Sequence, residues 1–305
     1  MNMQFHTFFG EIFTKNPRYV VDYLSEMLYN YKGVNWADFR GTLMDFKIIV
    51  VASSKGGVGK STVALGLSQA MAKRGEGVLI CDLDFGNACL DMLTGCENDV
   101  VYTVADAASG RCAPEDAVID IESLEISLLA CPSGGRLDTS ELDGNKVIDV
   151  VKSAAEYSGA SVVIIDTSAG VNPITNAAAK AADTVLVVSG HNPISLRAAE
   201  STVSRFSAFA EGEIKLVVNQ FDAESVLRRR SSRKGLLGII DSSRAPLAGV
   251  VPYDYGLMLN AEGVKGDSDA SRRAFANIAA RLSGEDVPLF SKMKRLRKKR
   301  IKLYK

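Results

Sequence analysis

The sequence predicts an α/β fold of three layers, in which helices cover both faces of a mostly parallel β-sheet. Apolar runs rich in Val and Ile recur from residue 46 onward, and apolar residues at consecutive positions are typical of strands buried on both faces. Stretches long enough for a helix separate most of these runs, which indicates parallel strands joined by right-handed crossovers. A glycine-rich loop at the first strand–helix junction points to the same fold.

The expected elements follow one another in chain order. Strands are expected at 47–53, 78–81, 126–130, 161–165, 184–188, 215–219 and 247–251, and helices at stretches such as 61–74, 172–182 and 193–209. We expect three parts: a helical extension over 1–45, a main domain over 46–286 and a basic tail over 287–305.

The first 46 residues differ from the rest in composition. They contain 11 of the 22 aromatic residues, including the single Trp. Tyr19, Tyr23, Leu24 and Met27 fall at helical spacing, which favours a short amphipathic helix. We interpret this segment as an additional helical layer.

The charges are balanced overall but unevenly distributed. The chain has 36 basic and 36 acidic residues, yet residues 291–305 contain nine basic residues and no acidic one. The preceding part is therefore acidic. This asymmetry indicates one local anionic partner, either a membrane surface or a nucleic acid.

The composition excludes several classes of protein. Hydrophobic residues at 47% and charged residues at 24% are ordinary for a globular protein. No apolar run reaches the length of about 18 residues that a membrane-spanning helix needs, and no secretory signal is expected. Five cysteines without a CxxC pair indicate reduced thiols in the cytoplasm. The two lone histidines argue against a histidine-based metal site.

The loop after the first expected strand has the residues of a nucleotide phosphate loop. Its glycines allow successive backbone N–H groups to face phosphates, and the helix that follows adds its N-terminal dipole. Lys60 supplies a positive charge for the β- and γ-phosphates, and the Ser61 hydroxyl suits Mg²⁺. Ser54 occupies the usual first glycine position. We expect the phosphates to bind at Gly56, Gly57, Val58, Gly59, Lys60, Ser61 and Thr62.

This loop, with its additional lysine Lys55, resembles the deviant phosphate loop of the MinD/ParA ATPases. The resemblance covers about residues 46–265 and includes CDLDFG at 81–86 and IIDTSAG at 164–170, which look like the two switch segments. It implies a P-loop ATPase that binds ATP and Mg²⁺ and dimerises around the nucleotide, with Lys55 reaching the partner's phosphates. Ser168 replaces the usual proline of the second switch, and Cys89 replaces a usual asparagine.

Three carboxylates follow expected strands near this loop. Asp82 and Asp84 are two residues apart, so alternation directs both to one side. Asp166 ends a hydrophobic strand, where an unpaired carboxylate is unfavourable without a cation. From spacing alone, either Asp82 or Asp84 can orient Mg²⁺ through water while the other positions the attacking water, and we expect Ser61 and Asp166 at the metal. The resemblance implies that Asp82 supports the metal and that Asp84 positions the water, so the expected catalytic residues are Lys55, Lys60 and Asp84.

A polar side chain ends another expected strand. The Asn219 amide can both donate to and accept from an adenine edge. The resemblance places base recognition at this residue, with Pro252 and Tyr253 beside the ring.

The basic tail can form an amphipathic helix. On a helical projection its large apolar residues share one arc and most cations lie outside it. The segment 290–305 resembles the membrane-targeting helix of the MinD branch and pairs apolar residues with cations, which suits an anionic membrane surface. Nucleic acid is the less favoured partner.

These features favour a MinD-like ATPase that dimerises when it binds ATP and organises septum placement in cell division. We expect it in the cytoplasm, peripherally bound to the inner face of the cell membrane. The resemblance also implies an activator or effector of the MinC/MinE kind. Three alternatives stay open: a MinD-like ATPase for flagellar number or placement, a ParA-like DNA partition ATPase, and a non-catalytic nucleotide-dependent scaffold.

Overall fold

The computed structural model describes residues 46–132, 142–222, 245–259, 269–289 and 291. The chain divides into two units, Met1–Phe46 and Lys47–Lys305, and all described elements belong to the second. The helical extension expected over 1–45 and the tail helix expected over 290–305 lie outside the described residues, apart from Ser291. Within the described part of the chain, no helix is long and apolar enough to cross a membrane.

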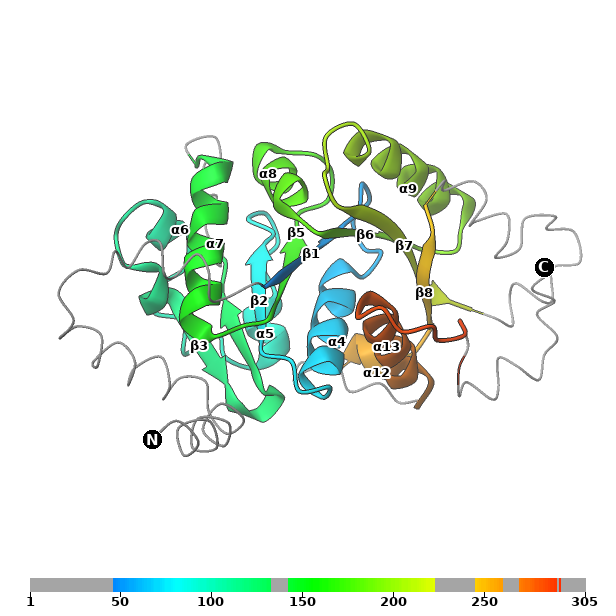
Figure 1. The fold of residues 1–305 in the computed structure, drawn as a ribbon, viewed down its shortest axis with the longest axis horizontal. Coiled ribbons are helices and arrows are strands. Elements are labelled where there is room, and N and C mark those ends of the chain that lie inside the picture. The colour runs from blue at the N-terminus through cyan, green and yellow to red at the C-terminus, as the bar shows by residue number, and fades with distance from the viewer. Residues whose placement is uncertain (1–45, 133–141, 223–244, 260–268, 290, 292–305) are drawn as a thin grey trace, which may run out of the picture. The chain divides into compact units, whose positions relative to one another are not determined.

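One eight-stranded sheet forms the centre of the second unit (Figure 1). Its order is β3-β4-β2-β5-β1-β6-β7-β8, and every neighbouring pair is parallel except β3 and β4. The strands are β1 (Lys47–Ala52), β2 (Val78–Leu83), β3 (Val118–Ile121), β4 (Ile126–Leu129), β5 (Val162–Thr167), β6 (Thr184–Ser189), β7 (Glu213–Phe221) and β8 (Leu247–Pro252).

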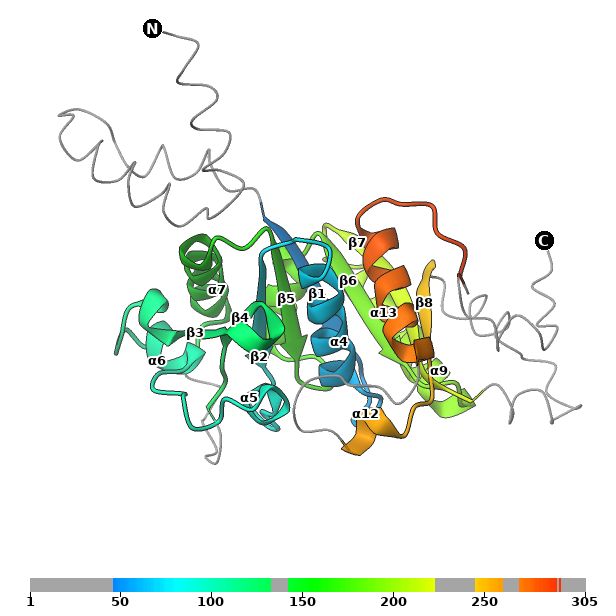
Figure 2. The ribbon, with the colours of Figure 1, turned by 90° about the horizontal axis from the view of Figure 1, so that it is seen from below.

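Helices cover both faces of this sheet, so the predicted three-layer α/β fold is confirmed (Figure 1). The α-helices of the described ranges are α4 (Lys60–Ala72), α5 (Leu90–Thr94), α6 (Val104–Ala108), α7 (Gly144–Ser158), α8 (Pro173–Ala181), α9 (Pro193–Phe206), α12 (Gly256–Leu259) and α13 (Asp269–Leu282). Helices α7, α8 and α9 lie on one face, and α4 and α13 lie side by side on the other (Figure 2).

The packing of these layers follows from the sequence. The central strands β1, β2, β5 and β6 are buried almost throughout, as their consecutive apolar residues require. Gly66 of α4 allows close approach of α13, since a Cβ there would lie 2.6 Å from the Phe275 ring. Asn172 and Asn192 cap α8 and α9 by accepting a hydrogen bond from a backbone N–H.

Each of the seven expected strands forms, but several elements were not predicted. The additional strand β3 is a short, partly exposed strand at the sheet edge, so it lacks the apolar run that identifies the central strands. Helix α7 also went unpredicted, although Val147, Val151 and Ala154 form a buried helical stripe. Strand β2 continues to Leu83 and β7 to Phe221, so Asp82 and Asn219 lie inside strands.

The parallel order determines where a site can form. The carboxyl ends of β1, β2, β5, β6, β7 and β8 meet at one edge of the sheet, which is where α/β folds bind ligands. This edge carries the phosphate loop after β1, Asp82 and Asp84 at the end of β2, the second switch at the end of β5, His191 after β6 and the Asn219–Gln220 pair at the end of β7.

Candidate functional site

The phosphate loop joins the buried strand β1 directly to helix α4. Gly59 is the residue before the helix and has φ 85° and ψ 40°, a left-handed conformation that favours glycine. A Cβ at Gly59 would also lie 2.3 Å from Asn219 Nδ2. The loop backbone therefore adopts a turn that brings it against β7. Lys60, the first helical residue, is buried.

Side chains from outside the turn hold the carbonyl groups of this loop. The Ser53 hydroxyl donates to the Lys55 carbonyl at 2.8 Å. The Asn219 amide donates to the Val58 carbonyl at 2.9 Å, and the Gln220 amide donates to the Gly57 carbonyl at 3.3 Å.

The N–H groups of the same loop remain available for a ligand. Those of Gly56, Gly57 and Gly59 donate no hydrogen bond to any residue in the described part of the chain. A loop whose carbonyls are bonded while its N–H groups are free is suited to bind an anion such as a phosphate.

Ser54, at the usual first glycine position, attaches the loop to α9. Its hydroxyl donates to the Ala198 carbonyl at 2.7 Å and accepts from the Thr202 hydroxyl at 2.7 Å. A glycine could make neither bond. The departure from the usual pattern thus has a structural use, which the sequence did not reveal.

Asp82 lies in β2 directly beside Asp166 of β5, since the two residues are register partners on adjacent strands. Its carboxylate accepts hydrogen bonds from the backbone N–H groups of Asp84, Cys89 and Leu90 at 2.9 to 3.1 Å. Burial raises the pKa of Asp82 to about 6, and these three donors oppose that rise. Both oxygens are therefore engaged in shaping the segment after β2.

The carboxylate of Asp166, unlike that of Asp82, accepts no hydrogen bond from the described residues. The residue is completely buried, and neither carboxylate oxygen has a hydrogen-bond partner among the described residues. Burial, and then the nearby Asp82, raise the pKa of Asp166 to about 8. The Ser61 hydroxyl and the Lys60 ammonium lower it, without completing a hydrogen bond to either oxygen.

These residues fit a magnesium ion whose coordination shell is completed by the phosphates of a nucleotide. No group of three or more His, Cys, Asp or Glu residues in the described ranges can hold a metal by itself. Mg²⁺ usually binds proteins through one or two carboxylates or hydroxyls and takes its remaining ligands from phosphates and water. The unpaired oxygens of Asp166 and the nearby Ser61 hydroxyl are of this kind.

Asp84 begins the segment after β2 and is buried. Its carboxylate accepts a hydrogen bond from the Asn87 backbone N–H at 3.2 Å, and its own N–H donates to Asp82. Lys55 is exposed at the tip of the phosphate loop. The structure therefore brings Lys60, Ser61 and the three carboxylates together and leaves Lys55 facing solvent.

The predicted base-binding residues differ in exposure. Asn219 is 3% exposed and packs on the phosphate loop, whereas Tyr253 is 50% exposed. The Tyr253 backbone N–H donates to the Phe221 carbonyl at 3.1 Å, which keeps the end of β8 beside β7. Pro252 is half-buried at that end.

Gln220 and His191 also lie near the phosphate loop, and the sequence predicted no role for either of them. Gln220 has φ 54°, which is unusual for a residue other than glycine, and His191 Nδ1 lies 3.0 Å from its carbonyl oxygen. The position of Gln220 after Asn219 was the only available signal, because a left-handed conformation cannot be read from the residue type.

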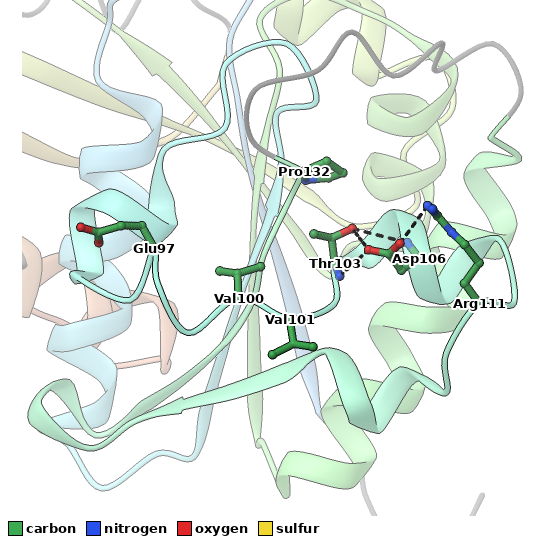
Figure 3. Close-up of a pocket in the computed structure, with 7 residues that line it drawn as sticks. All are labelled: Glu97, Val100, Val101, Thr103, Asp106, Arg111 and Pro132. Atoms are coloured by element: carbon green, nitrogen blue, oxygen red, sulfur yellow. Dashed lines mark hydrogen bonds and ion pairs between the residues drawn. The ribbon is translucent and has the colours of Figure 1, made fainter.

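A pocket of about 340 Å³ lies elsewhere, and none of the predicted site residues lines it (Figure 3). Three of its lining residues bond to one another: Thr103 and Asp106 cap α6 reciprocally, and Arg111 pairs with Asp106 at 2.8 Å. We therefore assign this pocket no part in the phosphate site. The five cysteines, all described, are free thiols.

The fold and the loop define a protein of the P-loop NTPase fold, and comparisons identify its family. A family model described as an AAA domain matches residues 46–216, more than half of the chain. The septum site-determining protein MinD of Synechocystis is 29% identical over 257 residues, which cover 81% of this chain and 93% of that protein. The chain belongs to the MinD/ParA family of P-loop ATPases.

Solved structures agree with this assignment. The MinC:MinD cell division protein complex of Aquifex aeolicus gives a TM-score of 0.70 at 28% identity, covering 80% of this chain and 98% of that chain. The MinD of Pyrococcus horikoshii complexed with Mg-ADP gives a TM-score of 0.66 at 24% identity, covering 78% and 96%, and supports the fold alone.

Proposed function

We propose that this chain is a Mg²⁺-dependent ATPase that dimerises around ATP, binds the cytoplasmic face of the cell membrane and helps to place the division septum. The observation that carries the proposal is the completely buried Asp166 carboxylate, unpaired among the described residues and adjacent to Lys60 and Ser61 of a phosphate loop. A buried carboxylate without a partner is unfavourable, and a magnesium–nucleotide complex would supply the missing positive charge.

The loop supplies the phosphate contacts in this proposal. Its free N–H groups and the N-terminus of α4 favour an anion, and the Lys60 ammonium adds a full charge at the β- and γ-phosphates. Residues Gly56, Gly57, Val58, Gly59, Lys60, Ser61 and Thr62 form this cradle.

Ser61 and the three carboxylates would bind the metal and orient the attacking water. Ser61 and Asp166 would hold Mg²⁺, which when bound shields the charge of the phosphates. Asp82 supports the metal indirectly, because its bonds to backbone N–H groups fix the segment that carries Asp84. Asp84 would accept a hydrogen bond from the attacking water and orient it.

The nucleotide's remaining contacts extend beyond the loop. Asn219, Pro252 and Tyr253 surround the proposed base site at the ends of β7 and β8. Lys55, exposed at the tip of the loop, would reach the phosphates bound by the second copy in the ATP-bound dimer. Hydrolysis would then be coupled to assembly, since each active site is incomplete without its partner.

The membrane and partner assignments depend on the sequence and on the relatives. The nine cations of 291–305, together with the apolar residues among them, suit an anionic lipid surface. The similarity to a MinC:MinD complex supports a MinC-like effector. The cell-division assignment is supported by MinD relatives that match most of the chain.

Calorimetric titration with Mg·ADP and a phosphate-release assay test the proposal directly. Lys60→Ala should weaken Mg·ADP binding by about 10- to 100-fold, as expected for the loss of a charge-assisted contact of about 1.5–3 kcal/mol. Lys73→Ala removes an exposed lysine just after α4 and should change nothing. Unaltered binding and turnover in Lys60→Ala would show that the phosphates bind elsewhere.

A further inference from the structure

We infer that Gln220 is a positioning residue for nucleotide binding: it holds the phosphate loop in its binding conformation without touching the nucleotide. Together with Asn219 it forms a pair of adjacent amides, here called the β7 clamp, that binds two consecutive carbonyls of the loop. This inference rests on the proposed nucleotide site and adds a residue that neither the loop motif nor the switch segments contain.

The clamp depends on an irregularity in β7. Side chains at successive positions of a regular strand point to opposite faces, so two neighbouring residues should not reach the same loop. Here, β7 contains one more residue than β8 between two paired positions, since Val218 pairs with Val250 and Phe221 pairs with Pro252. This bulge, with φ 54° at Gln220, directs both amides to the loop.

The surroundings keep Gln220 in this unfavourable conformation. A carbonyl oxygen can only accept a hydrogen bond, so the His191 Nδ1–H donates to the Gln220 carbonyl at 3.0 Å. The His191 ring also packs edge-on against Phe221, with ring centroids 6.0 Å apart. Non-glycine residues in left-handed conformations persist where surrounding contacts fix them, and they concentrate at functional sites.

The consequence for the loop is a prepared anion site. The Gln220 and Asn219 amides hold the carbonyls of Gly57 and Val58 at 3.3 and 2.9 Å. A carbonyl held in this way cannot rotate toward the phosphates, and the N–H groups on either side are left to face them. Loss of the Gln220 bond should therefore weaken binding of ATP and ADP alike.

Two substitutions separate positioning from a role in stability. Gln220→Ala removes the amide and retains the unfavourable φ, whereas Gln220→Gly removes the amide and relieves the conformation. Both should raise the Kd for Mg·ADP and the KM for ATP by about 3- to 10-fold, the effect of one hydrogen bond, with kcat unchanged because ground and transition states lose equally.

The thermal midpoint should respond differently. Without nucleotide, Gln220→Gly should melt at or above the temperature of Gln220→Ala, so the glycine variant would weaken binding without weakening the fold. Gln69→Ala, which removes a half-buried amide from α4, is the control and should leave the Kd unchanged. The inference is overturned if Gln220→Gly binds Mg·ADP as tightly as the wild type.

His191→Phe provides an independent check, because it preserves an aromatic ring beside Phe221 and removes the donor. It should raise the Kd in the same direction, and the double variant with Gln220→Gly should bind no more weakly than Gln220→Gly alone. Fully additive losses would show that His191 does not act through Gln220. If the wild type itself fails to bind Mg·ADP, the proposed function is wrong and the inference fails with it.

Discussion

Replacing Asp166 by Asn should stabilise the protein without nucleotide and abolish its stabilisation by Mg²⁺. The carboxylate is completely buried and unpaired among the described residues, so its ionisation opposes folding. The amide of Asn has nearly the same shape and carries no charge, but it cannot compensate a divalent cation.

The magnitude follows from the difference in pKa. Asp has its ordinary pKa of 3.8 in the unfolded chain, and burial raises it to about 8 in the folded one. The folded protein then retains a proton that the unfolded chain releases, so the stability is greatest below the unfolded pKa and is lost as pH rises through about 8. At pH 7 this loss is about 4 kcal/mol, from roughly three pH units at 1.36 kcal/mol each.

Asn recovers only part of this energy. A buried amide without partners costs about 1–3 kcal/mol, which leaves a net gain of about 1–3 kcal/mol at pH 7. For a domain of this size, the gain corresponds to a rise in Tm of about 2–10 °C.

Thermal unfolding at pH 5 and pH 8, with and without Mg·ADP, measures both effects. Without nucleotide, the Tm of the wild type should fall more steeply between these pH values than that of Asp166→Asn. A residual slope should remain, because burial raises the pKa of Asp82 to about 6. Added Mg²⁺ should increase the stabilisation by ADP in the wild type alone.

Asp149→Asn serves as the matched control, since this aspartate is exposed on α7, and it should reproduce the wild-type curves. The reasoning is refuted if Asp166→Asn is less stable than the wild type at pH 8 without nucleotide and shows the same dependence on pH.

Two further predictions concern hydrolysis and the membrane. Asp84→Ala should bind ATP with wild-type affinity but release phosphate at least about 10-fold more slowly. Light scattering should then show a persistent ATP-bound dimer. Turnover at the wild-type rate would exclude Asp84 from positioning water. Removing 290–305 should abolish ATP-dependent flotation with anionic liposomes and preserve dimerisation, while Leu296→Glu should weaken flotation more than Lys298→Gln. An increase with ATP is expected because a dimer would present two tails, with an avidity gain of roughly 100-fold. A truncated protein that still floats, or a full chain that instead shifts DNA with ATP, contradicts the membrane assignment.

Local sequence patterns predicted those parts of the fold that depend on nearest neighbours. The buried runs of β1 and β5 and the loop from Ser54 to Thr62 are contiguous, so their structure can be read directly. Asp166 was predicted at the end of β5 for the same reason, although its lack of a hydrogen-bond partner required the three-dimensional structure.

Other features depend on contacts between distant segments. The bond between Ser54 and Thr202 joins residues 148 positions apart, and the left-handed φ of Gln220 depends on a bulge between β7 and β8. The spacing of Asp82 and Asp84 predicted that both side chains point to one side, and the family resemblance implied that Asp82 supports the metal. Its three backbone donors include Cys89 and Leu90, which become neighbours only when the chain turns back after β2.

The attachment of Ser54 to α9 makes the phosphate loop a bridge across the sheet. At its C-terminal end the loop continues into α4, on one face of the sheet. At its N-terminal end the Ser54 hydroxyl is hydrogen-bonded to α9, on the opposite face. A change in the distance between the helices on the two faces of the sheet would therefore move the backbone of the phosphate loop. Packing changes beneath α9, for example at the buried Val203 or Phe206, would reach the nucleotide as changes in affinity, although neither residue belongs to the site.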